Sequence, residues 1–73
     1  MEQKVLIIIN EIRSAKKLPA VDELNPEMKL REDLGLTSFD LAELTVKIED
    51  EYDIDIFEDG LVSNIGEIFN KLS

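Results

Sequence analysis

The sequence predicts an all-α protein: a small bundle of three main helices and one short helix, with a long loop between the first and second helices. Three segments carry apolar residues at the spacing of a helix face, and the stretch between the first two holds Pro19, Pro26 and Gly35 without a sustained period. The chain has 73 residues, close to the lower limit for a single core without disulfides or metals. We therefore expect one domain over residues 1–73.

The first helix is expected over residues 2–17. Its apolar positions follow the i, i+3, i+4, i+7 spacing, and they are Val5, Ile8, Ile9 and Ile12. The β-branched run around Ile7 has strand propensity, but about fourteen periodic residues without a turn signal favour a helix. Lys16 and Lys17 suit the negative end of the helix dipole, and Pro19 then stops the helix.

Residues 18–37 form the expected long loop. Its scattered apolar side chains should hold it against the helices, and they are Leu24, Met28, Leu30, Leu34 and Leu36. Loops of this length without secondary structure are uncommon in compact domains and are often functional. The loop is therefore a place to look for a site.

The second helix is expected over residues 38–51. Thr37, followed three residues later by Asp40, matches a capping box, and Ser38 could serve as the cap instead. The stretch YDIDIFEDG then breaks the helical period and leads to the predicted short helix around residues 58–62.

The last helix is expected over residues 64–72. Asn64 and Glu67 offer its capping pair. Its apolar face consists of Ile65, Ile68, Phe69 and Leu72.

Charge is the strongest signal in the composition. Seventeen acidic residues against eight basic ones give a net charge of −9, although 44% of the residues are hydrophobic. Because an acidic surface repels the phosphates of nucleic acids and anionic lipids, we expect neither nucleic acid nor membrane insertion. The run VLIII is too short to span a bilayer, and no secretory pattern precedes it. We expect a monomeric cytoplasmic protein whose partners carry basic patches.

Missing residue types exclude several kinds of site. The chain has neither cysteine nor histidine, so it can form no disulfide, thiolate site or serine–histidine pair. The carboxylate-rich stretch after the second helix fails as a calcium-binding loop, because registers that start at Asp53 and at Asp55 both put the wrong residues at required positions. We therefore expect no catalytic residue and no metal site.

The second helix has two apolar sides. At roughly 100° per residue, one stripe should face the core, and it consists of Leu41, Leu44, Ile48 and Tyr52. Phe39, Ala42 and Val46 fall on the opposite side among acidic residues. A helix of so small a bundle rarely buries both sides, so the second stripe is a candidate docking face. Alternatively, Phe39 folds onto the long loop and the other two residues are ordinary surface positions.

Ser38 stands at the start of this helix. Taken alone, a serine at a helix start is far more often a cap than a reactive group. No histidine or neighbouring lysine could activate it as a nucleophile. The N–H groups of a helix N-terminus do, however, accommodate a phosphate. Ser38 is thus suited to accept a phosphate ester that another enzyme attaches.

The segment DLGLTSFDLAELTVKIEDEYDIDIF resembles the acyl carrier proteins, whose mark is a serine that follows a leucine–glycine turn and opens an acidic helix. The resemblance spans nearly the whole chain and is most specific over residues 33–52. It implies an acyl-carrier-like bundle in which a phosphopantetheinyl transferase attaches 4′-phosphopantetheine from coenzyme A to Ser38, with Mg²⁺ in the transferase site. The thiol of this covalent cofactor would then carry acyl groups as thioesters.

The resemblance also implies a docking face for partner enzymes. Phe39, Ala42 and Val46 match exposed apolar positions of the family, and the positions that meet basic patches on enzymes are Asp40, Glu43, Glu49 and Asp50. The family usually has Asp-Ser-Leu where this chain has Thr37, Ser38 and Phe39, which removes a carboxylate beside the modification site and enlarges the docking side chain.

The function that the resemblance implies is a stand-alone, non-catalytic carrier in fatty acid, polyketide or related biosynthesis. Its partners would be the transferase and enzymes that transfer or process acyl groups. The alternative is a small acidic helical interaction module that has no prosthetic group.

Overall fold

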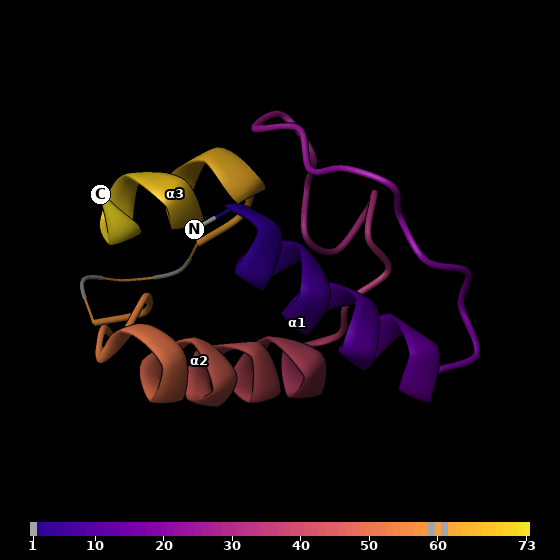
Figure 1. Cartoon of the computed structure of the whole chain (residues 1–73), viewed down its shortest axis with the longest axis horizontal. Coiled ribbons are helices and arrows are strands. Elements are labelled where there is room, and N and C mark those ends of the chain that lie inside the picture. The colour runs from indigo at the N-terminus through magenta and orange to yellow at the C-terminus, as the bar shows by residue number, and fades with distance from the viewer. Residues whose placement is uncertain (1, 59, 61) are drawn as a thin grey trace.

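Three helices make up the regular structure of the described residues. The computed structural model describes every residue except Met1, Asp59 and Leu61. The helices are α1 (Glu2–Ala15), α2 (Ser38–Tyr52) and α3 (Ile65–Leu72), and α1 packs directly against α2 (Figure 1). The described residues contain no strand beyond an isolated bridge. The predicted all-α class with a long loop between the first two helices is therefore confirmed.

Helix α1 buries the predicted face and ends two residues early. Val5, Ile8, Ile9 and Ile12 are all buried. The helix stops at Ala15 because Lys17 adopts a left-handed φ of 63°, and the Leu18 N–H then bonds to the Arg13 carbonyl at 2.9 Å. Such an ending is a common way to satisfy the last carbonyls of a helix.

The long loop is held against the helices, as its apolar residues predicted. Leu24, Leu30, Leu34 and Leu36 are buried and Met28 is partly buried. The Leu30 N–H also donates to the Ser63 carbonyl at 3.0 Å, and the Ile65 N–H donates to the Met28 carbonyl at 3.0 Å. The loop is thus fixed to the segment that leads into α3.

A turn precedes the place where the short helix was expected. Two residues of that expected helix, Asp59 and Leu61, lie outside the described part of the chain. Among the described residues of this segment, the Glu58 N–H bonds to the Asp55 carbonyl at 3.3 Å and the Gly60 N–H to the Phe57 carbonyl at 3.1 Å. Ile56, which lies in this segment, is completely buried, so the segment contributes to the core.

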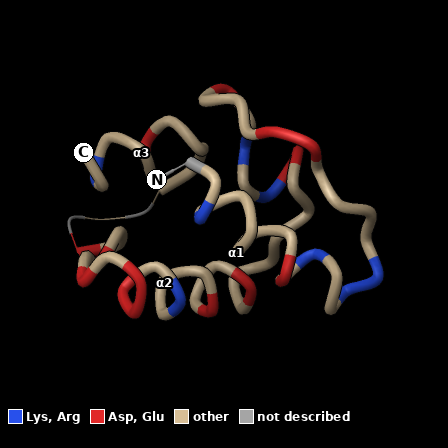
Figure 2. The backbone as a smooth tube through the Cα atoms, viewed as in Figure 1, with Lys and Arg blue, Asp and Glu red and all other residues tan. Residues whose placement is uncertain are grey.

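The two sides of α2 differ as the helical wheel predicts. Leu44 and Ile48 are fully buried, and Leu41 and Tyr52 pack partly against the core. The opposite side faces solvent. Figure 2 shows acidic residues along α2, with Lys47 as its single basic residue. Helix α2 therefore presents an acidic outer side to possible partners.

Candidate functional site

Thr37, and not Ser38, caps α2. Thr37 has extended φ and ψ of −89° and 175°, its hydroxyl oxygen accepts from the Asp40 N–H at 3.2 Å, and its own N–H donates to Asp40 Oδ2 at 2.9 Å. This is the reciprocal capping box that the sequence predicted. Ser38 is the first residue of the helix and is exposed, and its hydroxyl makes no hydrogen bond within the part of the chain that the structure describes. The Ser38 oxygen is consequently available to another molecule.

The structure corrects the expectation that Asp40 belongs to a docking face. Asp40 is only 8% exposed. Its Oδ2 accepts from Lys16 Nζ at 2.5 Å and from the Thr37 hydroxyl at 3.1 Å, as well as from the Thr37 N–H. The hydrogen bond from Lys16, followed by that from the Thr37 N–H, lowers the pKa of Asp40 below its ordinary value. The carboxylate is therefore used inside the fold.

Two cations at the end of α1 hold the segment before Ser38. Lys16 Nζ donates to the Gly35 carbonyl at 2.8 Å, and the Arg13 guanidinium donates to the Leu34 carbonyl and to the Pro19 carbonyl. We call Arg13 and Lys16 the α1 anchor. Because the anchor also pairs with Asp40, it fixes the chain on both sides of Ser38.

Gly35 fits this anchored segment for a steric reason. Its φ is +72°, a conformation that residues with a Cβ rarely adopt. A Cβ at this position would also lie 3.3 Å from Leu18 Cδ1. The glycine of the leucine–glycine turn therefore allows the chain to turn beside the end of α1 and deliver Ser38 to the surface.

The outer side of α2 carries the predicted apolar residues. Phe39 is 81% exposed, Val46 is 61% exposed and Ala42 is also exposed. We call these three residues the outer strip. The acidic positions Glu43, Glu49 and Asp50 are exposed as well. Phe39 does not fold onto the long loop, which was the alternative.

A pocket of about 380 Å³ opens beside Ser38. It lies between the first turns of α2 and the segment before α3. Its lining combines apolar side chains with polar ones, two of which come from the long loop. The lining residues are Arg31, Glu32, Ser38, Leu41, Ala42, Phe57, Val62 and Ser63. The free hydroxyl thus stands at the edge of a largely apolar cavity.

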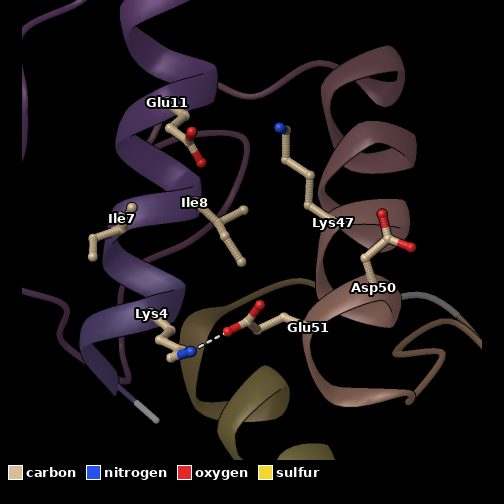
Figure 3. Close-up of a pocket in the computed structure, with 7 residues that line it drawn as sticks. All are labelled: Lys4, Ile7, Ile8, Glu11, Lys47, Asp50 and Glu51. Atoms are coloured by element: carbon tan, nitrogen blue, oxygen red, sulfur yellow. Dashed lines mark hydrogen bonds and ion pairs between the residues drawn. The ribbon is translucent and has the colours of Figure 1, made fainter.

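A second groove, of about 340 Å³, follows the contact between α1 and α2 (Figure 3). Lys4 and Glu51 form an ion pair across it, and Glu51 raises the pKa of Lys4. Glu11 and Lys47 extend toward each other from the facing helices. Every lining residue is aliphatic or charged, and Ser38 is not among them.

Some residues of the site could not be found from the sequence. Lys16 bonds to a residue 24 positions further along the chain, and Arg13 bonds to one 21 positions further along. Arg31 and Phe57 line the same pocket only in the folded chain. None of these pairs leaves a local pattern.

The described residues hold no cluster of acidic side chains that could bind a metal ion, and none of their helices is long and apolar enough to cross a bilayer.

The comparisons with known proteins agree with the geometry. The family model for a phosphopantetheine attachment site matches residues 7–68, most of the chain. No solved structure gives a significant match. Members of this family are non-catalytic carriers of covalent 4′-phosphopantetheine, and the exposed, unbonded hydroxyl beside the leucine–glycine turn suits such an attachment. The chain therefore belongs to the phosphopantetheine-binding carrier proteins, the family that includes the acyl carrier proteins.

Proposed function

We propose that Ser38 is the residue that carries 4′-phosphopantetheine. The strongest support comes from the start of α2. Thr37 caps the helix there, so the Ser38 hydroxyl is left exposed and without a hydrogen bond among the described residues. The phosphate would lie at a helix N-terminus, where free N–H groups and the helix dipole favour negative charge. When bound, the group supplies a thiol that forms thioesters, a chemistry that the cysteine-free chain lacks.

The chain's own residues would then present this group to enzymes. The outer strip supplies exposed apolar surface next to Ser38, and Glu43, Glu49 and Asp50 surround it with negative charge. Complementary charge steers association, while a central apolar anchor supplies binding energy. We propose that the phosphopantetheinyl transferase and acyl-processing enzymes dock here through basic patches.

The cargo we propose is an acyl chain in fatty acid, polyketide or related biosynthesis. The acidic α2 supports this class, because it resembles the helix of such carriers more closely than that of peptidyl carriers. Dependence on coenzyme A fits a cytoplasmic location for this carrier. An interaction module without a prosthetic group would also use the outer strip, but it would not explain the match to a phosphopantetheine attachment model.

Loading in vitro tests the attachment residue. The protein is incubated with coenzyme A, Mg²⁺ and a phosphopantetheinyl transferase of broad specificity, and its intact mass is measured. We expect the mass of the wild type to rise by one phosphopantetheine and that of Ser38→Ala to stay unchanged.

The matched control is Ser63→Ala. Ser63 lines the same pocket and is exposed, but its hydroxyl donates to Glu67 Oε1 at 2.7 Å. This variant should load like the wild type. Loading of Ser38→Ala, or no loading of the wild type by several transferases, would contradict the assignment.

A further inference from the structure

Arg31 is a cation at the edge of the pocket that contains Ser38. It comes from the long loop, whereas Ser38, Leu41 and Ala42 come from α2. The pocket thus brings a guanidinium and the free hydroxyl to one cavity. The sequence does not reveal this placement, because the six intervening residues include the glycine turn.

The backbone around Arg31 is fixed by hydrogen bonds on both sides. Its carbonyl accepts from the Gly35 N–H at 3.2 Å. The preceding residue, Leu30, is completely buried, its N–H donates to the Ser63 carbonyl, and its carbonyl accepts from the Leu36 N–H at 3.0 Å. Because this base is rigid, the Arg31 side chain loses less freedom on binding a group at the pocket than it would from a mobile loop.

The guanidinium of Arg31 is also unoccupied. Across the residues that the structure describes, its side chain forms no hydrogen bond and no ion pair. Glu32 lines the same pocket without pairing with it. In contrast, the two cations of the α1 anchor are fully engaged with Asp40 and backbone carbonyls. Within the described part of the chain, Arg31 is thus an unpaired cation that lines the same pocket as Ser38, in a protein of net charge −9.

We propose that the Arg31 guanidinium binds the phosphodiester that joins the prosthetic group to Ser38. Arginine presents a planar fork of donors that matches two phosphate oxygens, and it pairs with phosphate more specifically than lysine does. The contact keeps the first part of the arm at the pocket and shields its charge from the acidic side chains of α2. This inference rests on the assignment of Ser38 as the attachment residue.

Phosphorus NMR of the loaded protein tests the contact. Wild type, Arg31→Gln and Lys29→Gln are loaded, and loading is verified by intact mass. Lys29 is the matched control, because it is an exposed cation of the same loop that does not line the pocket. We expect the ³¹P resonance of Arg31→Gln to differ from that of the wild type, and the resonance of Lys29→Gln to coincide with it.

The arginine itself gives a second readout. Loading of the wild type should shift the Arg31 Nε–Hε resonance and leave that of Arg13 unchanged, since Arg13 is already bonded to Leu34 and Pro19. The ³¹P difference should largely disappear in about 1 M NaCl, where the Debye length is about 3 Å. Partial recovery of the ³¹P shift in Arg31→Lys would support a contact that depends on charge and fork geometry.

The outcomes separate the two proposals. If the wild type loads but the ³¹P resonances of all variants coincide and the Arg31 Nε–Hε signal does not move, the Arg31 contact is wrong and Ser38 stands. If the mass of the wild type does not rise, the attachment at Ser38 and the Arg31 contact both fall.

Discussion

The start of α2 and its outer strip lie next to each other but are built in opposite ways. At the start, Thr37 and Asp40 are hydrogen-bonded to each other. Lys16 forms an ion pair with Asp40 and donates to the Gly35 carbonyl. On the outer strip, Phe39 and Val46 are mostly exposed and are not among the residues that pack against the core. The side chains at the start of α2 are bonded within the fold, whereas those of the outer strip are exposed to solvent. Substitutions in the first should therefore change stability, and substitutions in the second should change partner binding.

The largest effect is expected on the outer strip. Phe39→Ala should lower kcat/KM for loading by a phosphopantetheinyl transferase roughly thirtyfold, about 2 kcal/mol, because a central aromatic anchor typically contributes that much to an interface. Its free energy of unfolding should change by less than about 0.5 kcal/mol, since the side chain is 81% exposed. Steady-state loading kinetics and urea unfolding measure the two quantities. If Phe39→Ala lost much stability but loaded normally, Phe39 would serve the fold and not partner binding, which would contradict the account.

The next effect is expected at the start of the helix. Asp40→Ala should lower the free energy of unfolding by about 1.5 kcal/mol, because it removes half of the capping box and leaves Lys16 without its partner. Glu43→Ala is the control, since this carboxylate lies on the same helix but is exposed. Urea unfolding of both variants measures the difference. Equal stabilities of the two variants would show that Asp40 contributes no more to the free energy of unfolding than an exposed residue does.

The stabilising effect of Asp40 should depend on pH in a defined direction. Its pKa is lowered in the folded protein, so its carboxylate stabilises the fold above the unfolded pKa of about 3.9. This contribution is lost as the pH falls through the lower folded pKa. The stability difference between wild type and Asp40→Asn should therefore be constant near pH 7 and shrink below about pH 4. A difference that grows on acidification would contradict the assigned ion pair.

The contrast between the two regions also explains what the sequence could predict. Helical periodicity is local, so it located the buried face of α1 and both sides of α2, and the i, i+3 pattern of Thr37 and Asp40 identified the capping box. The burial of Asp40 was not predicted, because its partner Lys16 lies 24 residues away and leaves no sign in the local pattern. The position of Arg31 at the pocket likewise depends on contacts between distant segments.

A smaller effect is expected from the anchor itself. Lys16→Met should lower the free energy of unfolding by about 1 kcal/mol, because it removes the side-chain donor to the Gly35 carbonyl and the cation that pairs with Asp40. Lys17→Met is the control, as Lys17 is exposed and makes no contact with Asp40. Denaturation at low and high salt measures both variants. If Lys17→Met is the more destabilising of the two, the α1 anchor does not hold the start of α2.

The smallest effect concerns the whole acidic surface. The net charge of −9 destabilises the compact state through self-repulsion, so Mg²⁺, Ca²⁺ or added salt should raise the melting temperature of the apo protein. We expect a shift of about 2 °C. In a domain of this size, a stabilisation of about 1 kcal/mol would produce a larger shift. A melting temperature indifferent to all three additions would show that the exposed carboxylates do not repel one another appreciably.

Peptide mapping of the protein from its native host tests the central assignment most directly. Trypsin should release residues 32–47, a peptide in which Ser38 is the only serine. We predict that fragmentation places a phosphopantetheine, free or acylated, on Ser38, and the mass of the arm would also identify the cargo. A phosphopantetheine on any other residue, or a Ser38 that is entirely unmodified, would contradict the account.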